Sequence, residues 1–134
     1  MRLINIDHVA IAVHDLDGAL AEYERQYHVH PEYREVIADQ GVEEAMLPIG
    51  ASYVQLLRPL SPDTPVGRFL AKHGEGLHHI AYAVPSLDDA LGHLTAEDVE
   101  LIDQHPRLGG GGHRIAFVHP RALAGTLIEL VELE

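Results

Sequence analysis

The sequence predicts an α+β protein built from two modules of the same order, each with a strand, a helix and three further strands (βαβββ). The main observation is an internal repeat: DHVAIAVHDLDGAL at residues 7–20 returns as HHIAYAVPSLDDAL at residues 78–91, with eight of fourteen positions identical at an offset of 71. A second echo pairs YVQLL at residues 53–57 with LIELV at residues 127–131. Both copies change from alternating apolar residues, typical of strands, to apolar residues at helical spacing.

The whole chain, residues 1–134, is predicted to be one domain, with the first module at residues 1–60. Residues 3–13 alternate as a strand. A helix at residues 15–27 begins with Asp15 as its N-cap. The rest of the module is predicted to be three strands separated by turn residues, at 31–37, 42–49 and 52–59.

Residues 61–74 are rich in proline and glycine and are predicted to link the modules through a short amphipathic helix at Val66–Lys72. The second module, residues 75–134, repeats the order with a helix at 86–96 capped by Ser86. Its predicted strands are 77–84, 99–103, 113–119 and 126–132. The loop at 105–112 contains a GGGG run that lacks the lysine and spacing of a phosphate-binding loop, so we expect a hairpin connection or a ligand-gating loop there.

Composition restricts the partners and the compartment. Nine basic residues against twenty-one acidic ones give a formal net charge of −12, which argues against nucleic acid and anionic membrane surfaces as partners. No apolar run approaches the ~20 residues that span a bilayer, and the opening residues do not look like a secretion signal. The absence of cysteine fits a reducing compartment. We therefore expect a cytoplasmic protein that binds a small molecule.

The repeat places polar residues at matching positions of the two halves, where His8 aligns with His79 and Gln55 with Glu129. Each histidine is followed on its strand face by two alanines, which leave room for a cavity, whereas the opposite face is bulky and suits a core. Gln55 and Glu129 stand in apolar strand segments, where a polar group needs a partner. These four residues are the candidate site.

Symmetry between the halves would bring those four side chains together. Two imidazoles, one amide oxygen and one carboxylate form a mixed nitrogen and oxygen ligand set that suits one divalent ion of Co, Mn, Ni, Fe or Zn. A catalytic site with open positions fits this set better than a structural zinc site, which often uses cysteine. The alternative is that the histidines are satisfied core residues, which a duplication would preserve equally well.

Nearly the whole chain resembles the vicinal oxygen chelate (glyoxalase/bleomycin resistance/dioxygenase) superfamily, and within it the methylmalonyl-CoA epimerase family. The matching segments are DHVAIAV at 7–13, DQGVEEAMLPIG at 39–50, LLRPLSPDTPVGRFLAKHGEGLHHIAY at 56–82 and FVHPRALAGTLIELVE at 117–132. One departure is Arg121, because the family motif commonly ends in HPK.

This resemblance implies a cupped, eight-stranded, open barrel-like sheet around a divalent metal held by His8, Gln55, His79 and Glu129. It also implies a homodimer that interconverts (2R)- and (2S)-methylmalonyl-CoA, an acyl-CoA substrate. The C2 proton would leave and return through a metal-stabilised enolate.

Epimerisation needs a base on each face of the reacting carbon, and the resemblance assigns these roles to Glu44 and Glu129. Strand alternation puts Glu44 on the face of Val42 and Met46, where burial would raise the pKa of its carboxyl toward the range useful for proton transfer. Alternation alone does not choose between Glu44 and Glu43, so the second base stays open between them on periodicity.

Other functions remain possible from the sequence. A glyoxalase I-type lyase, or another metal-dependent enzyme of the superfamily, would use the same scaffold, although glyoxalase I normally has glutamate where this chain has Gln55. A non-catalytic small-molecule binding protein would use the fold without a metal. The presence of all four ligand residues argues against that reading.

Overall fold

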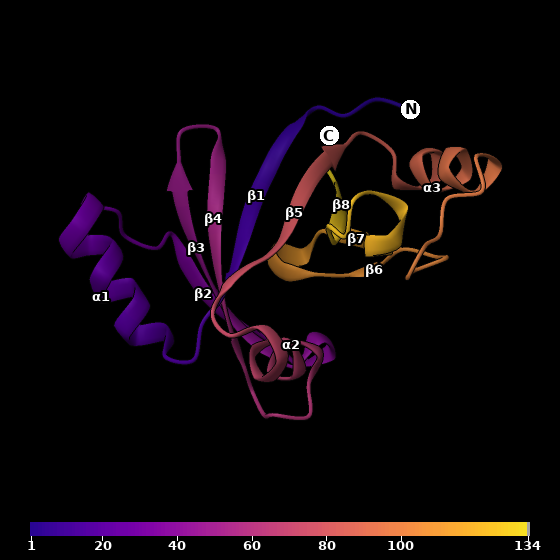
Figure 1. Cartoon of the computed structure of the whole chain (residues 1–134). Helices are drawn as coiled ribbons and strands as arrows, with labels where there is room; N and C mark the ends of the chain where they lie inside the picture. The colour runs from indigo at the N-terminus through magenta and orange to yellow at the C-terminus, as the bar shows by residue number, and fades with distance from the viewer. Residues whose placement is uncertain (134) are drawn as a thin grey trace. The chain divides into compact units, whose positions relative to one another are not determined.

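A computed structural model describes residues 1–133 of the chain (Figure 1). The first half contains β1 (Asn5–Ala12), α1 (Leu16–Tyr27), β2 (Tyr33–Ile37), β3 (Val42–Ile49) and β4 (Ser52–Pro59). Helix α2 (Pro65–His73) follows. The second half contains β5 (Gly76–Val84), α3 (Leu87–Ala96), β6 (Arg107–Leu108), β7 (Arg114–Val118) and β8 (Ile128–Glu132). The predicted α+β class with two βαβββ modules is confirmed.

Helices α1 and α3 begin at the predicted caps. The Asp15 carboxylate accepts a hydrogen bond from the Gly18 amide at 3.1 Å, and the Ser86 hydroxyl accepts one from the Asp89 amide at 3.2 Å. Each cap satisfies one of the amide groups that a helix N-terminus leaves without an intrahelical partner. Within residues 1–133, no helix is long and apolar enough to cross a membrane.

One predicted strand, residues 99–103, is wrong. Only Leu101 pairs there, in a single bridge with Val118. The chain then turns, because the Asp103 carboxylate accepts a hydrogen bond from the Phe117 amide at 2.8 Å and so takes the place of a strand neighbour. A side chain thus ends the pairing, which the apolar pattern does not reveal.

The missing strand lies inside the segment predicted as a loop. Strand β6 pairs with β7 in antiparallel register, with Arg107 opposite Ile115 and Leu108 opposite Arg114. The glycine run behind it forms a short 3-10 turn at Gly110–Gly112. The glycine run is therefore a hairpin connection, one of the two expected possibilities, but strand β6 lies within the predicted loop, later in the chain than the strand predicted at 99–103.

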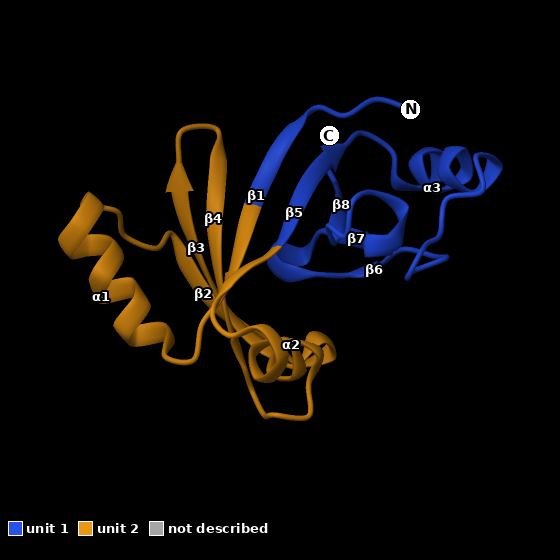
Figure 2. Ribbon diagram, in the orientation of Figure 1, with its two compact units in different colours: residues 1–8, 79–134 blue, residues 9–78 orange. Residues whose placement is uncertain are grey.

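The chain divides into two compact units (Figure 2). Unit 1 contains residues 1–8 and residues 79 onward, and unit 2 contains residues 9–78. Strands β1 and β5 contribute residues to both units. The strand order is β1-β5-β8-β7-β6 in unit 1 and β2-β3-β4-β1 in unit 2. The predicted division of one domain at residues 60 and 75 stays a prediction, and its last residue, Glu134, lies outside the described residues.

In unit 2 the sheet is covered on both faces. Helix α1 packs on one face, where the buried residues are Val13, Leu16, Ala45, Leu47 and Leu56. Helix α2 packs on the other, where Val66 and Leu70 join Ala10 and Ala12. Both alanines are completely buried. The alanine face of β1 is therefore filled in unit 2, where an open cavity wall was expected, because small side chains let a helix lie close to the strand.

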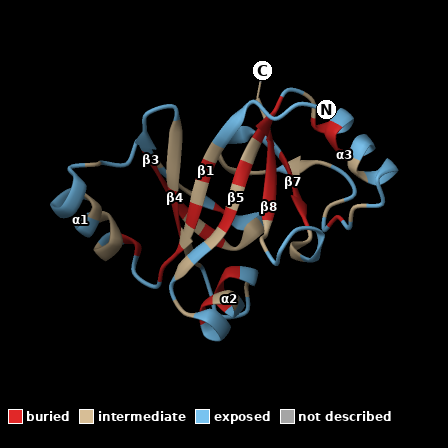
Figure 3. Ribbon diagram, turned by 45° about the horizontal axis from the view of Figure 1, so that its top comes forward, coloured by how far each residue is buried: buried red, intermediate tan, exposed pale blue. Residues whose placement is uncertain are grey.

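In unit 1 the alternation of β5, β7 and β8 separates two faces. Helix α3 covers one face, with Leu87, Ala90 and Leu91 against Ala116, Val118, Ile128 and Leu130. The other face contains Ala81, Ile115, Phe117 and Val131. Figure 3 shows β8 as a nearly continuous run of buried residues. Glu129 belongs to the second face, because it stands opposite Ala81 and Phe117 in the two strand registers.

Candidate metal and active site

Three of the predicted ligand residues meet in unit 1. The Nε2 atoms of His8 and His79 lie 3.2 Å apart. Oε1 of Glu129 lies 3.0 Å from His8 Nε2 and 3.7 Å from His79 Nε2. All three residues are buried. Within residues 1–133, no other group of histidine, aspartate and glutamate side chains brings its ligand atoms this close.

Strand geometry explains this convergence. Strands β5 and β8 are parallel with Ala81 beside Glu129, and His79 lies two residues before Ala81, on the same face. In unit 1, β1 is the neighbour of β5 on the side away from β8. Three residues far apart in sequence thus share one face of adjacent strands.

The donor set fits a divalent cation. With bonds of ~2.1 Å, neighbouring ligand atoms are ~3.0 Å apart in octahedral geometry and ~3.4 Å apart in tetrahedral geometry. The three observed separations run from 3.0 to 3.7 Å. Two imidazole nitrogens and one carboxylate oxygen suit borderline divalent metals and leave further coordination positions for a fourth ligand and a substrate.

Asp7 orients the first of the predicted ligands, His8. Its Oδ2 lies 2.7 Å from His8 Nδ1, so the Nδ1–H group donates to the carboxylate and Nε2 faces His79 and Glu129, where a metal would have to replace its proton. Sequence periodicity did not single out Asp7 as a site residue. The signal was its position next to His8, but strand alternation would place the two side chains on opposite faces. Asp7 is therefore a carboxylate that orients the His8 ring through Nδ1.

The side chains of this group shift one another's pKa values. Burial by itself would lower the pKa of His8, but hydrogen bonds to Asp7 and Glu129 outweigh it and raise that pKa to about 9. Burial by itself would raise the pKa of Glu129, but hydrogen bonds from His79 and His8 lower it to about 2. Glu129 is consequently an anion across the physiological range, as a metal ligand must be.

An aromatic ring and a guanidinium group line the same face. The Phe117 ring meets the His79 imidazole edge-on, with ring centroids 5.5 Å apart. The Arg107 guanidinium lies 5.4 Å from the Phe117 centroid, a cation–π contact, and its Nε is 3.4 Å from Asp103 Oδ2. Arg107 was not predicted as a site residue because it falls in the segment interpreted as a loop. It brings a positive charge beside the ring that covers His79.

Gln55 and Glu44 form a buried pair in unit 2. Met46 stands opposite Gln55 in the β3–β4 register, so Glu44, two residues before Met46, is a diagonal neighbour on the same face. Gln55 Nε2 donates to Glu44 Oε1 at 2.5 Å, and the two residues are 6% and 1% exposed. Gln55 Oε1 is buried and accepts no hydrogen bond within the described residues.

The structure also separates Glu43 from Glu44. The Glu43 carboxylate makes ion pairs with Arg34 at 3.1 Å and Arg58 at 3.0 Å, on the face opposite Glu44. Glu44 contacts the amide of Gln55 instead. Of the two carboxylates that periodicity left open, Glu43 is held by two guanidinium groups and Glu44 lies beside a predicted ligand.

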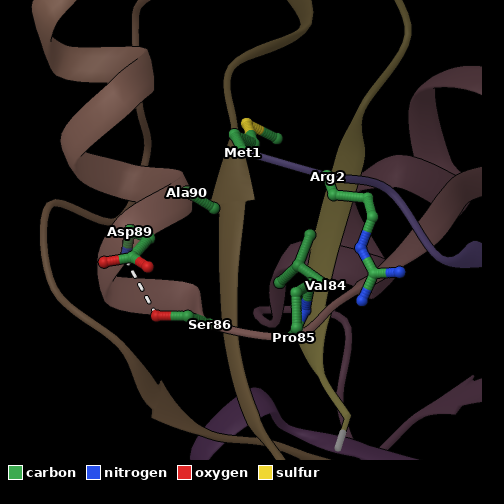
Figure 4. Close-up of a pocket in the computed structure, with 7 residues that line it drawn as sticks. All are labelled: Met1, Arg2, Val84, Pro85, Ser86, Asp89 and Ala90. Carbon is green, nitrogen blue, oxygen red and sulfur yellow. Dashed lines mark hydrogen bonds between the residues drawn. The ribbon is translucent and has the colours of Figure 1, made fainter.

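A separate hollow of about 230 Å³ lies at the start of α3 (Figure 4). Its lining residues are Met1, Arg2, Val84, Pro85, Ser86, Asp89 and Ala90. The Ser86 hydroxyl, which faces it, is engaged as the helix cap. None of the lining residues belongs to the group of His8, His79 and Glu129, and we assign this hollow no role.

Comparison with known proteins places the chain among its relatives. Residues 7–117 match the Glyoxalase/Bleomycin resistance protein/Dioxygenase superfamily. The Bacillus subtilis protein YqjC is 39% identical over 127 residues, which are 95% of this chain and 91% of that protein. The ethylmalonyl-CoA/methylmalonyl-CoA epimerase of Cereibacter sphaeroides is 31% identical over 130 residues, which are 96% of this chain and 97% of that protein.

A solved structure of a methylmalonyl-CoA epimerase in complex with methylmalonyl-CoA and NH4+ is similar over almost its full length. It is 43% identical, with a TM-score of 0.95, and the match covers 98% of this chain and 95% of that chain. The family resemblance seen in the sequence motifs is confirmed. The chain belongs to the glyoxalase/bleomycin resistance/dioxygenase superfamily, and methylmalonyl-CoA epimerases are among its full-length relatives.

Proposed function

We propose that this protein is a metal-dependent epimerase that interconverts (2R)- and (2S)-methylmalonyl-CoA. The observation that carries the proposal is the convergence of His8, His79 and Glu129 on one point, in a chain with epimerases among its full-length relatives. Glu129 lies 3.0 Å from one ring nitrogen of His8, and Asp7 contacts the other ring nitrogen. The arrangement is that of a ligand set with an outer shell.

The proposed ion is divalent, one of Co, Mn, Ni, Fe or Zn, and Gln55 supplies the fourth protein ligand. Support for Gln55 comes from its alignment with Glu129 in the repeat and from its buried oxygen without a hydrogen-bond donor. An amide oxygen that is buried without a partner is costly, and a cation would satisfy it. The ion would stabilise the negative charge that develops between the thioester and the carboxylate when the C2 proton leaves.

Proton transfer is proposed to use Glu44 and Glu129, one for each face of C2. The Gln55 N–H group holds Oε1 of Glu44 in a fixed orientation. One carboxylate would remove the C2 proton from its own face and the other would deliver a proton to the opposite face, so that the configuration at C2 inverts and solvent deuterium enters C2 once the bases exchange their protons with solvent. The Glu129 carboxylate is oriented by both imidazoles.

The test is exchange of deuterium from solvent into C2 of methylmalonyl-CoA, followed by NMR, together with metal analysis of the purified protein. We expect a stoichiometric divalent ion and C2 exchange that Glu129→Ala abolishes. The hemithioacetal of methylglyoxal and glutathione, the substrate expected of a glyoxalase I-type lyase, serves as the control substrate. A metal-loaded protein that leaves both compounds unchanged is not this enzyme and would have to be treated as a binding protein.

The assembly is proposed to be a homodimer, which acts in the cytoplasm. Three apolar side chains at the start of unit 1, Leu3, Ile4 and Ile6, are 48%, 43% and 46% exposed. Neighbouring exposed apolar residues favour burial against another protein surface, here a second copy. Sedimentation velocity should give the mass of two chains, and a monomer at micromolar concentration would refute this part of the proposal.

A further inference from the structure

The two modules place different neighbours beside equivalent ligands. In the β3–β4 hairpin, Gln55 has Met46 directly opposite and Glu44 as its diagonal neighbour. The diagonal contact is real, because the Gln55 amide donates to the Glu44 carboxylate at 2.5 Å. The first module therefore pairs an amide with a carboxylate.

The second module has the same register but different chemistry. Phe117 stands directly opposite Glu129 in the β7–β8 pair, and Ile115 is the diagonal neighbour. Since the repeat aligns Gln55 with Glu129, Ile115 occupies the place that Glu44 has in the first module. The second module thus pairs a carboxylate with an apolar side chain, and Ile115 is buried in that role.

Each module therefore contains one carboxylate in this diagonal pair, and the two types of pair have a physical basis. An amide can donate through nitrogen to Glu44 while its oxygen binds a cation. A carboxylate at position 55 could not donate, and it would stand beside a second buried anion in a low-dielectric environment. A carboxylate ligand is tolerated at Glu129 because Ile115 carries no charge.

We infer that Gln55 and Glu44 act as one coupled pair, in which Gln55 is a positioning residue for the Glu44 carboxylate. The amide at position 55 is required by the carboxylate at position 44, so this pair determines whether the first module can hold a second base. The roles of metal ligand and base rest on the proposed function, but the coupling itself rests on the hydrogen bond and the two registers.

The test is a cycle of four proteins: wild type, Gln55→Glu, Glu44→Gln and the double variant. Their thermal midpoints are measured without metal and above neutral pH. We expect Gln55→Glu to lower Tm by roughly 5–10 °C. The double variant should regain most of that loss, because the amide introduced at position 44 donates to the carboxylate introduced at position 55. If Gln55→Glu does not fold, recovery of folded protein in the double variant gives the same answer.

A second experiment places the residue types of the Glu129–Ile115 pair at positions 55 and 44. The variant with Gln55→Glu and Glu44→Ile reproduces the β7–β8 combination. We expect it to keep a Tm within a few degrees of wild type and to bind Co(II), read from the visible absorption of the ion, while C2 exchange is lost. Glu43→Gln, on the opposite strand face, is the matched control and should leave the cycle unchanged.

Additive Tm changes, with no recovery in either double variant, would overturn the inference. That outcome is distinguishable from failure of the proposed function. A wild-type protein that does not exchange the C2 proton would refute the epimerase assignment, whereas the coupling would still be visible in Tm and Co(II) binding. Conversely, if the wild-type protein exchanges the C2 proton but the Tm changes of the variants are additive, the epimerase assignment stands and the coupling between Gln55 and Glu44 is refuted.

Discussion

His8 Nε2 lies 3.2 Å from His79 Nε2, although 71 residues separate the two in sequence. The repeat explains this relationship, because each histidine occupies the same place in its own copy. Adjacent strands β1 and β5 then put both imidazoles on one face of unit 1. Glu129 completes a group of three donors, from which the following predictions derive.

Replacing His79 with alanine should abolish stoichiometric metal binding. Two donors remain, and the expected loss of affinity exceeds the 10–100-fold typically lost when only an outer-shell partner is removed. Isothermal titration with Co(II) measures it. His93→Ala, an exposed residue of α3, is the control and should bind like wild type, and unchanged affinity in His79→Ala would refute the ligand assignment.

Asp7→Asn should weaken metal binding by roughly 10–100-fold while the fold persists. The asparagine is nearly the same size but lacks the charge that holds the His8 Nδ1–H group. Circular dichroism checks the fold, and Co(II) titration measures the affinity. The exposed linker residue Asp63 provides the matched change, Asp63→Asn, which should have no effect. Equal affinities in the two variants would mean that Asp7 does not orient the ligand.

Glu44→Gln should keep the metal and reduce turnover by about 10²–10⁴-fold, the usual contribution of a positioned base. The change removes proton-accepting ability while it preserves the shape of the buried side chain. Glu43→Gln breaks the ion pairs with Arg34 and Arg58 on the opposite face and should retain most of the activity. A Glu44→Gln protein with the wild-type rate would end the two-base proposal.

Removal of the metal with a chelator should lower Tm and stop C2 exchange. An ion that binds only the folded state stabilises it by about 2.7 kcal/mol when its free concentration is 100 times Kd. Adding back each candidate divalent ion in turn should restore Tm, and differential scanning calorimetry measures the recovery. The His79→Ala variant should show no response to either step, which separates site-specific from general salt effects.

Two glycines in helices should respond in opposite directions to alanine. A Cβ at Gly67 in α2 would lie 2.5 Å from the Ser61 carbonyl oxygen and 2.7 Å from that of Pro62. Gly67→Ala should therefore destabilise the protein by about 1–3 kcal/mol. A Cβ at Gly92 in α3 meets nothing within 4 Å, so Gly92→Ala should stabilise by about 0.5–1 kcal/mol. Urea denaturation measures both, and stabilisation by Gly67→Ala would contradict the close packing of α2 on its own linker.

The sequence predicts much of this molecule because local signals agree there. Strands β3 and β4 begin and end at the predicted residues 42–49 and 52–59, since turn residues and period-two alternation point to the same boundaries. The caps at Asp15 and Ser86 are short-range features and were also predicted. The candidate ligands could be named because duplication repeats a position, and a repeated polar residue in an apolar strand is visible in the letters alone.

The incorrect predictions have a common cause: each depends on a contact between residues that are far apart in the sequence. Strand 99–103 was wrong because the Asp103 side chain, not a backbone neighbour, binds the Phe117 amide. The alanine face of β1 was expected to line a cavity, but α2 covers it with Val66 and Leu70 in unit 2. No periodicity within a segment reports which helix will pack on it.

By itself, the sequence determined the element order, the duplication, the family motifs and the residues that could bind a metal, because these depend on residue type and spacing along the chain. Only the tertiary structure decided that Asp7 holds His8, that Glu43 pairs with arginines, and that Gln55 donates to Glu44. Those contacts depend on strand register and side-chain direction. Both are fixed when distant strands align, since one hydrogen-bonded alignment sets every pair on a face at once.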